Sequence, residues 1–213
     1  MKSKTIFLPL AMAVVLIAAC KKEPAAPTVF PDYSNLAVGN YWIYQQFEVD
    51  EAGNAVPKNV FDSAYVEKDT LINSETYFKV FRKNPYSMKP DYSYLRDSLH
   101  YLVDAAGTIH FSSQDFETTF RSYAILAVPP DTIARVSLKM ADKDLSVETP
   151  AGTFITSNFQ ETFIIYPNWV HGVNPRTINI RYAENVGIVV ERLPFFLSNP
   201  KYLEKRLIRY HVN

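Results

Sequence analysis

The chain of 213 residues contains a single cysteine, Cys20, and its surroundings limit the chemistry that a thiol can do here. A lone thiol serves as a nucleophile, a metal ligand or an acceptor of an alkyl group, and it cannot form a disulfide within the chain. Cys20 directly follows an apolar run from Ile6 to Ala19 and precedes Lys21 and Lys22. This placement favours modification of the thiol over catalysis by it.

The segment before Cys20 has the anatomy of a secretory signal peptide, with Lys2 and Lys4 at the start, an apolar centre and small residues at the end. About 20 apolar residues are needed to span a bilayer as a helix. The run here is shorter and interrupted by Pro9, so it is too short for a stable membrane span.

The last four residues of this segment, Ile17-Ala18-Ala19-Cys20, resemble the lipobox of bacterial lipoproteins. That resemblance implies cleavage between Ala19 and Cys20, with acylation of the thiol and of the new amino group. Two or more acyl chains anchor a protein durably, whereas one chain alone binds only marginally. An ordinary signal peptide with an incidental cysteine is the alternative.

Three segments follow from this reading. We predict a signal peptide over residues 1–19, a lipidated Cys20 with a flexible tether over 20–31, and one domain over 32–213. The tether contains three prolines between Lys21 and Pro31 and shows no hydrophobic periodicity.

The remaining residue types do not assemble a recognisable catalytic or metal site. Four histidines stand at positions 100, 110, 171 and 211, and a metal site normally needs a third protein ligand at a defined spacing. No G-x-S-x-G elbow occurs, and we interpret the carboxylates of Asp142 and Asp144 as part of a charged, solvated loop. We therefore expect no catalytic residue, no metal and no cofactor.

Aromatic residues are the best candidates for binding. The chain has 14 Phe, 14 Tyr and two Trp, more than a small core needs, and apolar ligand sites arise in this way on curved sheets. The candidates for an apolar groove are Trp42, Tyr44, Trp169, Phe195 and Phe196. Trp169 belongs to a long loop over residues 166–176, and loops on rigid scaffolds often carry function.

Charge and glycine spacing exclude two classes of ligand. Without residues 1–19, which hold Lys2 and Lys4 and no acid, 20 Lys and Arg face 22 Asp and Glu, a net charge of −2. Nucleic-acid binding usually needs a clearly basic surface. The basic, aromatic run 201–211 is better explained as a final strand with a solvated cationic face. Glycine-rich nucleotide-binding motifs are also absent from the sequence.

Alternation of apolar and polar residues predicts a mainly β protein. Val136, Leu138 and Met140 alternate with polar residues, and residues 177–182 and 208–212 repeat the pattern. Turn residues separate these runs, and Gly187 suits a tight bend. We predict a single domain built as a strongly curved antiparallel sheet or partial barrel of about ten strands, with a β-sandwich as the alternative. One or two short helices are expected, over residues 113–119 and 33–38.

Three phrases resemble a group of uncharacterised Gram-negative lipoproteins. They are VGNYWIY (38–44), VETPAGTF (147–154) and YAENVGIVVERL (182–193), followed by a closing strand RLIRYHV. In that group a lipobox precedes an antiparallel β-domain of unknown function. The layout is also similar to the curved half-barrels of periplasmic lipoprotein carriers. The resemblance implies a fold and the role of Cys20, and it carries over no other functional residue.

The sequence predicts a non-enzymatic lipoprotein of the cell envelope, anchored in the outer membrane on its periplasmic face or at the cell surface. The lead hypothesis is binding of an apolar ligand, a lipid or a lipoprotein segment on a concave aromatic face. The alternative is a structural or adaptor subunit that docks on an envelope protein by an edge strand. Hydrolysis of an envelope polymer is a third, minor hypothesis.

Overall fold

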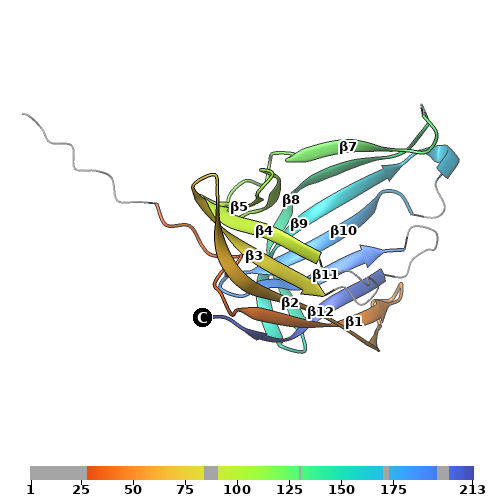
Figure 1. Cartoon of the computed structure of the whole chain (residues 1–213). Coiled ribbons are helices and arrows are strands. Elements are labelled where there is room, and N and C mark those ends of the chain that lie inside the picture. The colour runs from red at the N-terminus through yellow and green to blue at the C-terminus, as the bar shows by residue number, and fades with distance from the viewer. Residues whose placement is uncertain (1–27, 84–90, 130, 170–172, 196–201) are drawn as a thin grey trace, which may run out of the picture.

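A computed structural model describes residues 28–83, 91–129, 131–169, 173–195 and 202–213 (Figure 1). Nearly all of the regular structure is β. The twelve strands are β1 (Tyr41–Val49), β2 (Ala55–Ile72), β3 (Glu75–Lys83), β4 (Asp91–Ser98), β5 (Tyr101–Asp104), β6 (Ile109–Ser112), β7 (Arg121–Leu126), β8 (Thr132–Thr149), β9 (Gly152–Ile165), β10 (Arg176–Ala183), β11 (Gly187–Pro194) and β12 (Tyr202–His211).

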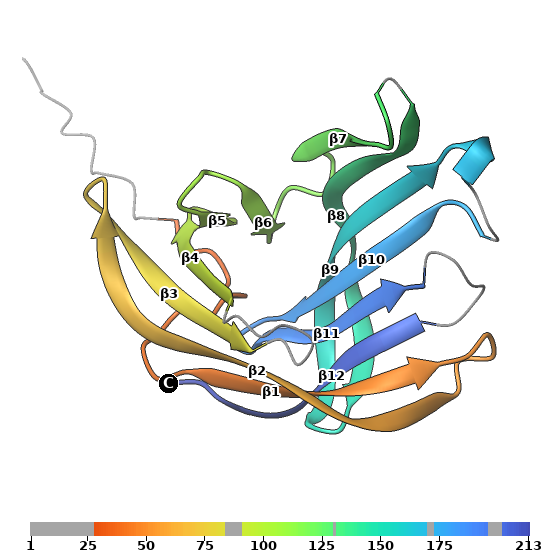
Figure 2. The ribbon, with the colours of Figure 1, turned by 45° about the vertical axis from the view of Figure 1, so that its right-hand side comes forward.

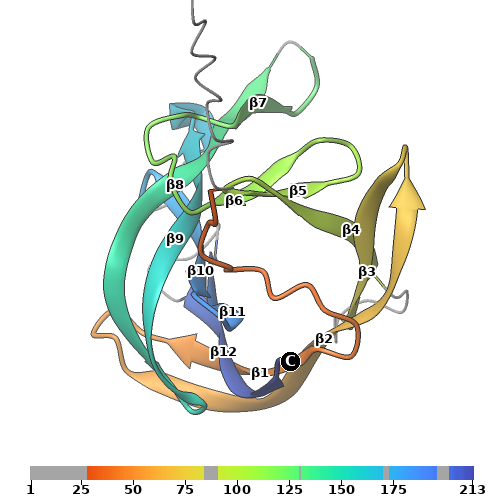
Figure 3. The same ribbon diagram turned by 90° about the vertical axis from the view of Figure 1, so that its left-hand side faces the viewer.

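All twelve strands belong to one antiparallel sheet. Its order is β6-β5-β4-β3-β2-β1-β12-β11-β10-β9-β8-β7, so the chain forms two meanders that meet where β1 pairs with β12. The edges are β6 and β7, which are consecutive in the chain. The sheet curls so far that its two edge strands lie on the same side of the molecule (Figures 2 and 3). This confirms the predicted curved sheet, with twelve strands rather than about ten.

Bulges in the long strands produce much of the curvature. β8 pairs with β9 along 132–149 but changes register between Met140 and Asp142 and again between Asp142 and Leu145. Asp144, inside the second irregularity, has a φ of 61°. A bulge bends its strand and increases the local twist, which is what a sheet needs in order to curl. The loop predicted around Asp142 and Asp144 is therefore wrong, because these residues form the bend of a continuous strand, whereas the predicted solvation holds for Lys143 and Asp144, which are exposed.

Side-chain packing joins the open edge to the opposite wall. Phe111 of β6 is 3% exposed and packs its ring against Tyr182 of β10, with the ring centroids 4.5 Å apart. Val136, Met140 and Phe159 from β8 and β9 belong to the same buried cluster. The interior is thus closed near β6 by apolar contacts rather than by strand pairing.

The segment that precedes β1 crosses one end of the curled sheet (Figure 3). It contacts both meanders. The Ser34 hydroxyl donates to the carboxylate of Asp97 in β4 at 2.7 Å, and the backbone N–H of Asn185, between β10 and β11, donates to the backbone carbonyl of Asp32 at 2.7 Å. Tyr33 packs on Phe111 at 4.9 Å. The N-terminal segment therefore ties the two meanders together before the chain enters the sheet.

The two predicted helices are wrong. In residues 113–119, the Ser112 hydroxyl accepts hydrogen bonds from the amides of Gln114 and Asp115, and the Asp115 carboxylate accepts from those of Glu117 and Thr118. Such side-chain bonds satisfy amides without helical pairing, so they compete with a helix.

In residues 33–38, the carboxylate of Asp32 plays the same part toward the amides of Ser34 and Asn35, and Asn35 has a φ of 48°. The helical element of the described residues is a single 3-10 turn, η1 (Pro167–Trp169). Within the described part of the chain, no helix is long and apolar enough to cross a bilayer.

Candidate functional site

The concave face of the sheet contains a cavity of about 250 Å³. Its apolar lining comes from both meanders and includes Trp42, Tyr44, Val80, Leu95, Ile180 and Ile188. Except for Ile188, which lies at a register shift between β10 and β11, these residues alternate along their strands with neighbours on the other face, as the period of two in a strand requires. The sequence pattern that predicts the strands therefore also predicts which side chains face the cavity.

Two of the five predicted ligand-binding residues, Trp42 and Tyr44, lie side by side in this wall. Trp42 is 5% exposed and Tyr44 is 2% exposed. The Trp42 indole donates to the carbonyl of Val186 at 2.6 Å, and the Tyr44 hydroxyl donates to that of Ile188 at 3.0 Å. Because their polar atoms are satisfied by β11 and the turn before it, the ring faces remain as apolar wall.

Gly187 lies against this wall, as the predicted tight bend requires. Its φ is +100°, and a Cβ atom added there would lie 3.2 Å from the indole nitrogen of Trp42. A larger residue would strain the backbone and press on the indole, so the bend and the aromatic wall depend on each other.

The other three candidates are placed differently. Trp169 lies in η1 with 42% of its surface exposed, and Phe195 follows β11 with 41% exposed; neither lines the cavity. Phe196, together with Ala19, Cys20 and His171, lies outside the described residues. The roles predicted for Trp169, Phe195, Phe196 and the cleavage and lipidation sites therefore stay predictions.

The three histidines that the structure describes have separate partners, and the ring of His211 stacks on that of Tyr41 with centroids 5.9 Å apart. His100 Nδ1 lies 3.0 Å from the Ser112 hydroxyl, and His110 Nε2 lies 3.0 Å from the carboxylate of Asp104. His110 also lines the cavity. Among the described residues, no three His, Cys, Asp or Glu side chains gather in a way that would hold a metal ion.

A charged cluster, which we call the interior ion cluster, borders the cavity, and two of its members, Arg82 and Glu191, line it. Glu191 of β11 pairs with Arg82 of β3 at 2.7 Å, although β2, β1 and β12 separate these strands in the sheet. Lys205 of β12 reaches Glu191 at 3.4 Å and Asp62 of β2 at 2.6 Å. The side chains of Glu191 and Asp62 are 8% and 0% exposed. The curvature of the sheet thus gathers two acids and two bases in its interior.

Burial and pairing act in opposite directions on the pKa values of this cluster. Burial raises the pKa of Glu191, but Arg82 and Lys205 outweigh burial and hold that pKa below its ordinary value of 4.5. Burial also lowers the pKa of Arg82, and Glu191 more than compensates, so the guanidinium stays charged. Burial raises the pKa of Tyr44 above its ordinary value. At neutral pH the cavity is therefore lined by a compensated ion pair and a neutral phenol.

One donor of this cluster is unused. The Nε atom of Arg82 is buried and has no hydrogen-bond partner among the described residues. Because Arg82 lines the cavity, its wall combines apolar rings with a hydrogen-bond donor. The cavity can thus hold an apolar group and orient one polar atom next to it.

Sequence reasoning missed the interior ion cluster. Its members lie far apart in the chain, and each is a single charge in a strand. One signal exists: Glu191 shares the parity of buried Val189, and Lys205 shares that of buried Leu207. Residues 202–211 of this run form a strand, as predicted. Arg209 is exposed, but Lys205 does not belong to a solvated cationic face, because it points inward to Asp62 and Glu191.

Comparison with solved structures identifies the fold. A protein of Bacteroides fragilis, described as exported and as having a YmcC-like fold, matches with a TM-score of 0.50 and 12% identity, over 85% of this chain and 100% of that one. The fold is shared with that protein. A Parabacteroides distasonis protein described as a lipoprotein matches with a TM-score of 0.45 and 14% identity, over 86% of this chain and 100% of that one.

Neither a protein-family model nor a curated protein matches the chain. At 12% identity the Bacteroides fragilis structure supports the predicted β-domain as a fold and carries no ligand, site or activity over to this chain.

Proposed function

We propose that this protein is a lipid-anchored binding protein of the cell envelope that holds an apolar group in its concave cavity. The cavity itself carries the proposal, because its wall is largely apolar and includes Ile180 and Ile188, and the polar atoms of Trp42 and Tyr44 are paired with backbone carbonyls. The signal peptide and lipobox in the sequence support the envelope location. The Bacteroides fragilis protein that shares the fold is described as exported, which agrees with that location.

The volume of the cavity limits the size of the ligand that it can hold. Its volume of about 250 Å³ is slightly below the range of about 300–1,000 Å³ that is usual for small-molecule pockets. We therefore expect it to take one acyl chain or one apolar side chain rather than a complete lipid. The buried Nε atom of Arg82 would donate to a carbonyl or ester oxygen at the end of that group.

Filling the cavity tests this proposal. Full-length protein purified in detergent should carry an apolar adduct in native mass spectra, and Val80→Phe should reduce the occupied fraction at least about tenfold because the added ring takes the space of the ligand. Lys83→Phe adds the same ring to an exposed position of the same strand and should leave the adduct unchanged. Wild-type spectra without any adduct, or equal occupancy in both variants, would contradict binding in the cavity.

A docking role has one structural observation in its favour. β7 is the last strand of the sheet, and five of its six residues are exposed, so its outer edge can accept a further strand. The cavity experiment separates the two functions, because Val80→Phe should not change the affinity for a partner that adds a strand to β7.

Anchoring has its own test. Cys20→Ser should abolish metabolic labelling with palmitate and leave the signal peptide uncleaved, because the acceptor thiol is gone. Lys22→Ser changes a neighbouring residue of the tether, keeps the lipobox and should label normally. Palmitate labelling that persists in Cys20→Ser would show that the lipid is attached elsewhere.

A further inference from the structure

A second hollow lies on the other face of the same strands. It has a volume of about 310 Å³ and is lined by residues of β8 to β12. On β10, Asn179 and Arg181 face this hollow, whereas Ile180 and Tyr182 face the cavity. The two sites are therefore separated by the sheet, and we call the second one the outer polar trough.

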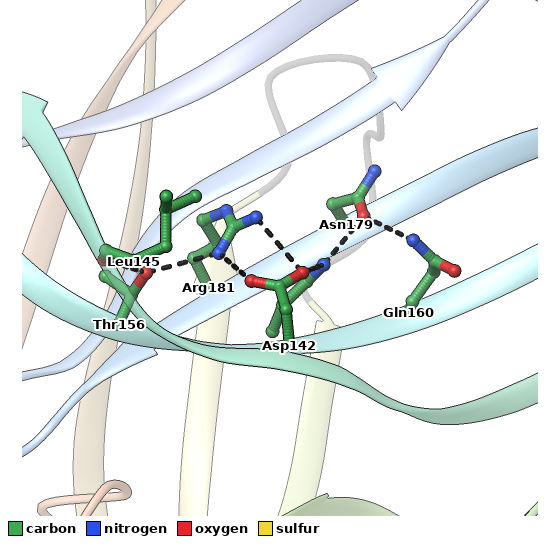
Figure 4. Close-up of polar contacts among 7 residues, drawn as sticks. Asp142, Leu145, Thr156, Gln160, Asn179 and Arg181 are labelled. Atoms are coloured by element: carbon green, nitrogen blue, oxygen red, sulfur yellow. Dashed lines mark hydrogen bonds and ion pairs between the residues drawn. The ribbon is translucent and has the colours of Figure 1, made fainter. Parts of the chain in front are cut away.

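The bend of β8 forms one side of the trough. Asp142, at the bend, accepts hydrogen bonds from Arg181 Nη1 at 2.8 Å and Nη2 at 3.4 Å (Figure 4). Arg181 Nη1 also donates to the Thr156 hydroxyl at 3.3 Å, which in turn donates to the carbonyl of Leu145 at 2.9 Å. Three strands thus hold the guanidinium in one orientation, and the pKa of Asp142 is lowered despite partial burial, chiefly because Arg181 and Asn158 bond to it.

A row of amide side chains forms the floor. The amide nitrogens of Asn158 and Gln160 both donate to the Asn179 oxygen at 2.9 Å, and the nitrogen of Asn179 donates to the Thr177 hydroxyl at 3.1 Å. Asn158 also donates to the Asp142 carboxylate at 2.9 Å. A carboxylate only accepts, so the nitrogen of Asn158 must face Asp142 and its oxygen must face the other way.

That oxygen is the observation that points to a ligand. Asn158 is 1% exposed, and its Oδ1 is buried with no hydrogen-bond partner among the described residues. Buried polar atoms are nearly always paired, and an exception calls for a donor that the chain itself does not supply. Asn158 lines the trough, so the missing donor would have to be a ligand group that enters between the side chains of the trough.

The formal charges of the trough sum to zero, because its lining contains three arginines and three acids: Arg181, Arg192, Arg206, Asp142, Glu148 and Glu204. Glu204, with a side chain only 4% exposed, is held by Arg192 and Arg206, whose guanidinium groups approach its two oxygens at 2.5 Å and 2.6 Å. Arg181 is compensated by Asp142. A neutral ligand can use the remaining N–H groups, since each guanidinium has five, and it adds no uncompensated charge to this balanced set.

We propose that the outer polar trough binds a neutral, polyhydroxylated ligand, that is, a sugar unit of a glycan. A sugar hydroxyl both donates and accepts, so it can donate to Asn158 Oδ1 and accept from a neighbouring guanidinium. The aliphatic side chains of Leu145, Val147 and Val190 also line the trough and can cover the C–H face of a sugar ring. The volume is at the lower end of the range for ligand pockets and suits one small ring.

This proposal does not depend on the cavity. The sheet separates the two sites, so sugar binding should survive Val80→Phe, and a failure of the cavity proposal leaves the trough proposal standing.

Titration of the full-length protein with a panel of neutral mono- and disaccharides, followed by saturation-transfer NMR, tests the trough. The panel comprises glucose, galactose, mannose, N-acetylglucosamine, maltose and cellobiose. At least one should bind saturably, and Asn158→Leu should raise its dissociation constant at least about tenfold. Leu145→Trp should do the same, because residue 145 is 48% exposed and its new ring would occupy the trough without disturbing the core.

Ile155→Trp is the matched control, because Ile155 is 59% exposed on the same hairpin and does not line the trough. Its dissociation constant should stay within about twofold of the wild type. The proposal is overturned if folded wild-type protein binds none of these sugars, if both trough variants bind as well as Ile155→Trp, or if inorganic phosphate or a peptide competes the sugar out.

Discussion

Glu191→Gln is expected to lower the free energy of unfolding by about 3 kcal/mol. Removing one partner of a buried ion pair leaves the other charge without compensation and typically costs about 3–5 kcal/mol. We expect the lower end because Arg82 keeps 30% of its side-chain surface exposed and Lys205 keeps Asp62 as a partner. Urea unfolding followed by tryptophan fluorescence measures the change, since Trp42 lies in the same interior.

A more exposed pair of similar chemistry provides the control. Glu48→Gln removes the carboxylate that pairs with Lys58 at 2.7 Å, where the side chains are 29% and 44% exposed. Exposed ion pairs contribute about 0–1 kcal/mol, so this variant should unfold at nearly the wild-type urea concentration. Equal losses of unfolding free energy in the two variants would show that burial of Glu191 does not increase the contribution of its ion pairs to stability.

The pH dependence of the same pair has a definite sign. The pKa of Glu191 is lower in the folded protein than its ordinary value of 4.5, so the unfolded chain takes up a proton first as the pH falls. The stabilisation is complete above pH 4.5 and is lost as the pH falls through the lower, folded pKa. The difference in stability between wild type and Glu191→Gln should therefore be largest near neutral pH and shrink on acidification. A difference that grows on acidification would mean that Glu191 is held protonated.

Phe111→Ala is expected to lower the free energy of unfolding by about 3–5 kcal/mol, the usual loss for a fully buried phenylalanine. Phe111 is 3% exposed and packs on Tyr33 and Tyr182. It holds the edge strand β6 against β10, a strand with which β6 has no ladder of hydrogen bonds. Beyond the global loss, hydrogen exchange should accelerate in β5 and β6 more than in β1 and β12, because the edge is released first.

Phe61→Ala is the corresponding control, since Phe61 is a strand residue of the same type that is 46% exposed. Its loss should be on the order of 1 kcal/mol or less. If Phe111→Ala is as mild as Phe61→Ala, the closure of the sheet at β6 does not depend on this ring.

The fold class could be read from the sequence because alternation is a local property. Val136, Leu138 and Met140 are 0%, 8% and 0% exposed, as their shared parity predicts. The bend at Gly187 could be predicted for the same reason, since its positive φ is a requirement of the local backbone. The helices predicted over 33–38 and 113–119 do not form. Hydroxyl and carboxylate groups there accept hydrogen bonds from nearby backbone amides, and a prediction from helix propensity does not include this competition.

For the candidate site too, the sequence predicts what depends on neighbouring residues and does not predict what depends on distant ones. Alternation assigns Trp42 and Tyr44 to one face of a strand, but it cannot say whether that face closes around a cavity, because closure depends on the bulges of β8 and on Phe111 meeting Tyr182. The sequence by itself determined the strands, the turns and the predicted lipid attachment at Cys20, all of which depend on neighbours along the chain. Only the tertiary structure decided that Arg82 meets Glu191 and that Asp142 meets Arg181, because curvature brings together residues that no local pattern relates.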